Sequence, residues 1–171
     1  MKKSVLFFGC LALGTLPLTY GASADKSAED QHFVNEAALG GKMEIELGTL
    51  AEKNGSNAEV KQFGQQMVTD HTRLNNELGD TAKKVGLQVP AELDSKQQAE
   101  ISSLSKLSGK EFDARYSALM VKDHTDDLAA FQKAGAATQN EDLKKAIGDA
   151  VPVIRHHLEM AKMIQQKVAG K

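Results

Sequence analysis

Apolar residues recur along most of the chain at alternating spacings of three and four, with polar residues between them. This is the period of an α-helix that buries one face. Stretches with a period of two, which would indicate strands, are missing from the sequence. Alanine, leucine, lysine, glutamate and glutamine dominate instead, and all five favour helices. The pattern predicts an all-α protein.

Turn-forming residues divide this pattern into helices. Asn54 to Asn57 form the first turn, Gly86 begins the second break, and residues 135–139 form a loop before Asn140. Asparagine is a good N-cap and glycine a frequent stop signal, so these residues predict where helices begin and end. The predicted helices cover residues 30–53, 58–85, 94–107, 110–134 and 141–168.

The segment from Gly86 to Gly109 decides the expected topology. It is long enough to run back along a bundle, because each helical residue spans about 1.5 Å and each extended one about 3.3 Å. A crossover of this kind would make the helices at 58–85 and 110–134 parallel, and we favour it. The alternative is an up-down-up-down bundle with a surface helix at 94–107. The sequence thus predicts a four-helix bundle with a long crossover that contains a short extra helix.

Residues 1–24 have the features of an export signal. Lys2 and Lys3 precede an apolar run from Val5 to Leu18, and small residues up to Ala24 match a cleavage site. The apolar run is too short to span a bilayer comfortably, and charges interrupt every later stretch. We therefore expect cleavage after Ala24, no membrane-spanning segment in the mature chain, and a location in the periplasm or at the outer membrane.

Cleavage would leave 147 residues, with residues 25–30 as a polar tail and residues 31–171 as one bundle domain. The only cysteine, Cys10, would leave with the signal, which excludes disulfides and thiolate ligands. Loss of Lys2 and Lys3 would leave 19 basic against 23 acidic residues, a net charge of −4. Because the two signs are interspersed and form no basic stripe, we expect no binding to nucleic acid.

Each long predicted helix carries one polar side chain on its apolar stripe. Four-helix bundles build metal sites from such inward residues. Burial without a partner would cost each group about 1–3 kcal/mol, and a shared cation would satisfy all of them. Carboxylate oxygen and neutral imidazole nitrogen suit zinc, iron or copper. The predicted metal ligands are Glu44, His71, His124 and His157.

A local repeat places the same side chains on two of these helices. Residues 67–72 read MVTDHT and residues 120–125 read MVKDHT, so five of six positions agree. Asp70 and Asp123 therefore adjoin the two stripe histidines, where a carboxylate could orient an imidazole ring or bind the ion itself. Met67 and Met120 lie one turn earlier. Their thioethers would favour copper, although methionine more often fills the core of a bundle.

A metal-free interaction or structural module with an envelope protein as its partner is the competing hypothesis. A single buried histidine is usually hydrogen-bonded to a neighbour, and Glu44 could simply pair with one. Histidines that titrate near pH 6.5 could also sense acid. His32 and His156 are expected to be exposed. An enzyme ranks third, because no Ser-His-Asp order, phosphate loop or nucleotide fingerprint is present.

Four segments form a fairly specific pattern, with Asp-His in the second and third segments and His-Leu in the fourth. They are Glu44 to Leu50, Val60 to Asn75, Ser108 to His124 and Pro152 to Leu158. In these segments the chain resembles the bacterial family called domain of unknown function 4142, over nearly the whole expected mature chain. The resemblance implies an exported or envelope-associated, ferritin-like helical bundle, often labelled an outer-membrane protein, and it implies no particular function.

The expected metal site differs from that of di-iron bundles. Those proteins use one glutamate on each of two helices and Glu-x-x-His on the other two. The helices at 110–134 and 141–168 contain no Glu-x-x-His and have no carboxylate on their stripes. A histidine-rich site for one ion is therefore the better expectation.

Overall fold

The chain folds into five helices in the computed structural model, which describes residues 20–170, with side chains from residue 27. Residues 1–19, most of the expected signal peptide, lie outside the described residues. Within residues 20–170 no strand is present, and no helix is both long and apolar enough to cross a bilayer. The helices are α1 (Tyr20–Asn54), α2 (Ala58–Lys84), α3 (Ser95–Ser105), α4 (Gly109–Ala137) and α5 (Glu141–Ala169).

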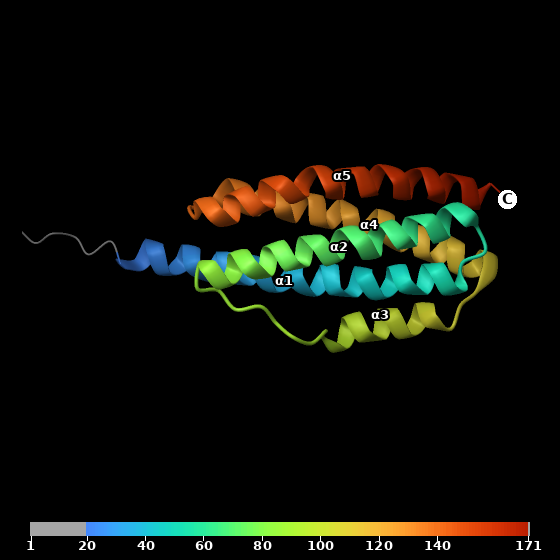
Figure 1. Cartoon of the computed structure of the whole chain (residues 1–171), viewed down its shortest axis with the longest axis horizontal. Coiled ribbons are helices and arrows are strands. Elements are labelled where there is room, and N and C mark those ends of the chain that lie inside the picture. The colour runs from blue at the N-terminus through green and yellow to red at the C-terminus, as the bar shows by residue number, and fades with distance from the viewer. Residues whose placement is uncertain (1–19, 171) are drawn as a thin grey trace, which may run out of the picture.

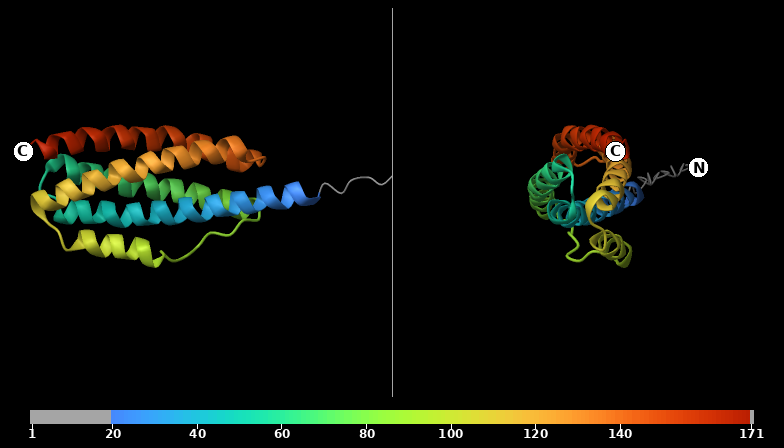
Figure 2. Two further views of the ribbon diagram at one scale, coloured as in Figure 1. Left: turned by 180° about the vertical axis from the view of Figure 1, so that it is seen from behind. Right: turned by 90° about the vertical axis from the view of Figure 1, so that its right-hand side faces the viewer.

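The four long helices lie side by side along one direction, and α3 lies outside them (Figures 1 and 2). Helix α1 packs mainly on α2, and α4 packs mainly on α5. The two pairs join where α2 meets α5 and where α1 meets α4, so α1 and α5 are diagonal to each other, as are α2 and α4. The predicted all-α helical bundle is confirmed.

The long connection between α2 and α4 is a crossover. After α2 ends, the chain runs back beside α1 and through α3 to the end of the bundle where α2 began (Figure 1). There Gly55, before α2, forms an isolated parallel backbone bridge with Gly109, the first residue of α4. Helices α2 and α4 are therefore parallel, as the crossover predicts, and the up-down-up-down alternative is wrong.

The helix ends follow from the expected cap residues. The side chain of Asn57 accepts a hydrogen bond from the backbone of Glu59, and Asn140 accepts one from Leu143. Each bond satisfies a backbone donor that the first turn of a helix leaves free. Gly86 follows α2 with a φ of +79°, a conformation that favours glycine.

Two predicted boundaries are wrong. Helix α1 begins at Tyr20, so residues 25–30 are helical rather than a tail. No glycine or proline interrupts residues 25–30. The hydroxyl of Thr138, just after α4, also donates a hydrogen bond to Asp30. Helix α4 continues to Ala137 through Gly135, where we expected a loop. A Cβ at Gly135 would lie 3.0 Å from Ile147, so a small residue lets the two helices approach while the adjacent alanines favour the helix.

The core consists of two apolar clusters, one toward each end of the bundle. They form because the stripe residues of the long helices face one another, and each large apolar side chain buried in this way contributes about 1.5–3 kcal/mol. One cluster includes Leu47, Phe63, Met67, Phe112, Tyr116 and Met120, and the other includes Phe33, Val34, Leu78, Ala82, Leu143 and Ile147.

Helices α1 and α2 approach each other closely at a pair of glycines. A Cβ at Gly48 would lie 2.7 Å from the carbonyl oxygen of Gly64, and a Cβ at Gly64 would lie 2.6 Å from that of Gly48. Real Cβ atoms do not come so near, so only glycine permits this spacing. The close approach lies one turn from Glu44 and two turns from His71. It brings α1 near enough to α2 for the carboxylate of Glu44 to reach His71.

Candidate metal centre

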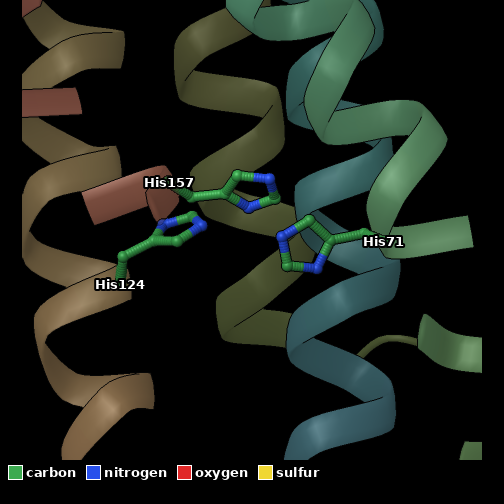
Figure 3. Close-up of side chains that lie close together, drawn as sticks. All are labelled: His71, His124 and His157. Carbon is green, nitrogen blue, oxygen red and sulfur yellow. The ribbon is translucent and has the colours of Figure 1, made fainter. Parts of the chain in front are cut away.

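Three buried histidines from three helices meet in the middle of the bundle (Figure 3). His71 comes from α2, His124 from α4 and His157 from α5, and they are 5%, 0% and 0% exposed. The ring centroids lie 5.3 Å apart for His71 and His157, 5.4 Å for His124 and His157, and 5.6 Å for His71 and His124. The rings thus form a nearly equilateral triangle, and the expected convergence of the three histidines is confirmed.

One nitrogen of each ring faces a protein oxygen. Nδ1 of His71 lies 3.1 Å from Oε2 of Glu44, and Nε2 of His157 lies 2.9 Å from Oδ2 of Asp70. Nδ1 of His124 lies 3.0 Å from the carbonyl oxygen of Met120 and 3.4 Å from Oε1 of Glu44. A carbonyl can only accept a hydrogen bond, so Nδ1 of His124 donates and carries the proton of the neutral ring.

The second nitrogen of each ring has no hydrogen-bond partner among the residues that the structure describes. These atoms are Nε2 of His71, Nε2 of His124 and Nδ1 of His157, and all are buried. In Figure 3 one nitrogen of each ring points toward a common space, and the rings offer one ligand atom each within 4.8 Å of the others. Unpaired lone pairs facing one another at this depth cost about 1–3 kcal/mol each. A cation between them would remove that cost.

The size of the triangle is close to what one ion requires. A tetrahedral zinc ion binds imidazole nitrogen at about 2.0–2.1 Å, which places its ligand nitrogens roughly 3.4 Å apart. The ligand atoms here lie within 4.8 Å of one another, so the rings would have to rotate toward the centre to reach that spacing. The three histidines, with Glu44 beside them, could therefore hold a metal ion.

Burial keeps all three rings neutral. It lowers the pKa of His71 well below its ordinary value, and the neighbouring rings of His124 and His157 lower it further. Burial and His157 lower the pKa of His124 to about 3. Burial also lowers the pKa of His157, although the hydrogen bond to Asp70 opposes the shift. Neutral imidazole is the form that binds metals, whereas an acid sensor near pH 6.5 needs rings with ordinary pKa values.

Glu44 connects two of the histidines from α1. It is 2% exposed, and burial raises its pKa well above the ordinary value, with Asp127 and Asp123 adding to the shift. A cation at the three imidazoles would act in the opposite direction, because a nearby positive charge favours the carboxylate. The structure thus places the predicted residue Glu44 against His71 and His124.

The repeat also suggested four further side chains as metal ligands or as partners of the rings, and these lie in different surroundings. Asp70 does contact an imidazole ring, but the ring is that of His157 on α5 rather than its neighbour in sequence. Oδ1 of Asp123 lies 3.9 Å from Nζ of Lys122. Burial raises the pKa of Asp123 to about 6. Met67 and Met120 are fully buried in the apolar cluster that contains Phe63, so their side chains pack in the core. His32 and His156 are exposed, as expected.

Sequence reasoning missed Asp113, which holds α2 and α4 in register. Asp113 is 2% exposed and lies near the start of α4. Its carboxylate accepts hydrogen bonds from the backbone nitrogens of Ser56 at 3.0 Å and Asn57 at 2.9 Å, just before α2. The contact fixes the relative height of the helices that carry His71 and His124. The only signal in the sequence is an acidic residue next to the stripe residue Phe112.

Asp127 was missed as well. It lies one turn after Asp123 on α4, and residues four apart on a helix share a face. Burial and the negative charges of Asp123 and Asp126 raise its pKa to about 7. The i,i+4 spacing of two aspartates was the signal that could have identified it, because this spacing directs both carboxylates toward the same part of α1, where Glu44 lies.

Comparison with known proteins agrees with the resemblance in sequence. Residues 16–164 match the family described as domain of unknown function (DUF4142). The match includes Glu44 and the three histidines of the centre. No curated protein and no solved structure matches the chain. The family description names no activity, so any function must be argued from the geometry of the site. The chain belongs to the DUF4142 family.

Proposed function

We propose that this protein binds a transition-metal ion in the core of its bundle and that His71, His124 and His157 are the ligands. One observation supports the proposal above all others: three buried ring nitrogens without partners face one another at a spacing close to that of metal ligands. Neutral imidazoles suit zinc, iron or copper, and the ion's identity depends on the geometry that the rings adopt around it.

Three oxygen atoms would hold the rings in the orientation that binding requires. Glu44 faces His71, the carbonyl of Met120 faces His124, and Asp70 faces His157. Each contact occupies the nitrogen that points away from the centre, which leaves the other nitrogen unprotonated and free to bind. Metal-binding histidines in proteins usually have a partner of this kind. Glu44 would in addition offset part of the charge of the ion.

The cellular setting is also a proposal. The signal-like residues 1–24 support export to the periplasm or the outer membrane, where the protein would handle metal or take part in an envelope stress response. We further propose that the bundle is ferritin-like, since such folds have four long helices and one long crossover connection. The centre would nevertheless differ from a di-iron site, because it offers three imidazoles and a single carboxylate.

A metal-free interaction or structural module is the second candidate. It is favoured by the fact that each imidazole already has one acceptor, as histidines with a structural role do. It ranks second because it gives no partner to the three inward nitrogens.

Metal content distinguishes the two candidates. The purified protein, without an added histidine tag, would be incubated with zinc, iron or copper, desalted, and analysed for metal by mass spectrometry. We expect one ion per chain in the parent and in His156→Ala, a matched control that removes an exposed histidine next to the site. We expect His124→Ala to lose the ion. A parent without stoichiometric metal, or a His124→Ala variant with the affinity of the parent, would refute the proposal.

A further inference from the structure

An open groove of about 590 Å³ lies between α1, α3 and α4, and Glu44 forms part of its floor. Its lining is rich in carboxylates, and some of these have cationic partners. Lys122 pairs with Asp126 at 2.8 Å, and Arg115 pairs with Glu100 at 2.8 Å. The acidic lining residues include Glu36, Glu44, Glu100, Asp123, Asp126 and Asp127.

Two carboxylate oxygens of this groove are buried and accept no hydrogen bond from the described part of the chain. They are Oε1 of Glu44 and Oδ2 of Asp123. Glu44 is 2% exposed, so its unpaired oxygen has little contact with bulk water. Each buried acceptor without a partner costs about 1–3 kcal/mol, which a passing cation would relieve. The groove is thus electrostatically suited to a positive ion at its inner end.

A small, largely enclosed cavity lies behind this inner end. It has a volume of about 30 Å³, and its lining includes both Glu44 and His71. The groove and the cavity share Ala37, Glu44, Asp127 and Phe131 as lining residues. These four side chains therefore form the boundary between an open, acidic groove and the space beside an imidazole of the centre. A volume of this size holds about one or two water molecules, or a single ion.

We propose that this groove is the access route by which a divalent cation reaches the three histidines. The proposal rests on the proposed function and adds the path and the residues that guide the ion. Asp123 and Asp127 attract the cation to the inner end, and Glu44 passes it to His71 and His124, whose rings it already contacts. Carboxylates that line one cleft focus the electrostatic field and increase the rate at which cations associate.

Gly40 provides a way to close the groove without disturbing the core. It lines the groove one turn before Glu44, and a Cβ at this position would meet no atom within 4 Å. At the next residue the situation differs, since a Cβ at Gly41 would clash with Oδ1 of Asn75. The variant Gly40→Phe therefore places a large side chain in the groove. Gly40→Ala is its matched control, because it adds one methyl group and the same helix-favouring change.

The first test is the rate of metal binding by the purified protein, followed by stopped-flow absorption with Co²⁺ alone as the probe. A barrier on the only route slows entry and release equally and leaves the equilibrium unchanged. We expect Gly40→Phe to lower both the association and the dissociation rate about tenfold or more, with Kd within about twofold of the parent. Gly40→Ala should keep the rates of the parent.

The second test removes a negative charge and does not depend on filling the groove with a large side chain. At pH 8, where Asp127 is ionised, Asp127→Asn should lower the association rate about threefold to tenfold at low ionic strength, and high salt should remove the difference. Asp80→Asn is the matched control, because Asp80 is exposed in the groove between α2 and α5, on the other side of the bundle. It should leave the association rate unchanged.

The outcomes separate this inference from the function on which it rests. A parent that binds no Co²⁺ would overturn both. A parent that binds Co²⁺, with Gly40→Phe and Asp127→Asn both binding at the rate of the parent, would overturn only the access route. A lower affinity of Gly40→Phe with an unchanged association rate would also overturn the route, because it would mean that the variant damages the centre.

Discussion

Oδ2 of Asp70 on α2 lies 2.9 Å from Nε2 of His157 on α5. This contact directs Nδ1 of His157 toward the centre, whereas His71 and His124 have Nε2 as the unpaired nitrogen. The three rings therefore do not present the same atom. The difference follows from the nitrogen that each partner occupies: Asp70 faces Nε2 of His157, whereas the partners of His71 and His124 face Nδ1.

Removal of the Asp70 carboxylate should weaken metal binding without unfolding the protein. Asp70→Ala leaves Nε2 of His157 without its acceptor, so the ring loses its preferred tautomer and orientation. We expect an affinity loss of about 10- to 100-fold, as for other oxygen partners of metal-binding histidines. Competition with a chromogenic chelator measures this loss, and Asp80→Ala, on the exposed face of the same helix, is the control. Equal affinities of Asp70→Ala and the parent would mean that the contact has no role in binding.

The His124 ring should make the stability of the metal-free protein depend on acid. Its pKa is 6.5 ordinarily and about 3 in the folded protein, so the unfolded chain binds a proton that the folded ring does not between these values. The stability from the neutral ring is complete above pH 6.5 and is lost as the pH falls toward 3. We expect the stability difference between the parent and His124→Gln to shrink from pH 7 to pH 4 in urea unfolding. A difference that stays constant would contradict the shift.

Asp127 should have the opposite effect. Burial and neighbouring aspartates raise its pKa from 3.8 to about 7, so the folded chain holds a proton that the unfolded chain has lost. The stability that protonated Asp127 contributes is complete below pH 3.8, the pKa in the unfolded chain, and is lost as the pH rises through about 7. Asp127→Asn should therefore gain stability over the parent from pH 4 to pH 7 and keep a constant gain above pH 7. Thermal melting of the metal-free proteins measures this, and a gain independent of pH would count against it.

Asp113 should prove important for both stability and the centre. Asp113→Ala removes the acceptor of the backbone nitrogens of Ser56 and Asn57 at a partly buried turn, and each lost hydrogen bond costs about 0.5–1.5 kcal/mol. We expect a clear decrease in unfolding free energy and weaker metal binding, because the helices with His71 and His124 lose their register. Ser108→Ala is the control, since Ser108 caps α4 without a side-chain hydrogen bond. Equal stability of the two variants would show that the contact is dispensable.

Much of the fold could be predicted from the sequence. The buried stripes from Val60 to Leu78 and from Leu143 to Ile164 have regular spacing, and capping residues mark their starts. The crossover followed from the length of one connection. The extent of α1 and the passage of α4 through Gly135 could not be predicted, because weak local signals there are overridden by contacts between helices.

The candidate site was predictable only in part. Periodicity identified which side chains face inward, because an inward position depends on the residues of a single helix. The height of one helix against another depends on Asp113 and on the close approach at Gly48, and neither follows from periodicity. The partner of each ring is a three-dimensional property too, since Asp70 and His157 are 87 residues apart.

X-ray absorption spectroscopy of the protein loaded with one equivalent of zinc would show whether the three imidazoles bind the ion. We expect a shell of nitrogen or oxygen ligands at about 2.0–2.1 Å that includes three imidazoles. The outer-shell scattering of one imidazole should disappear in each of His71→Ala, His124→Ala and His157→Ala, and it should persist in His156→Ala. A zinc shell without imidazole scattering, or one that the three variants leave unchanged, would contradict the account.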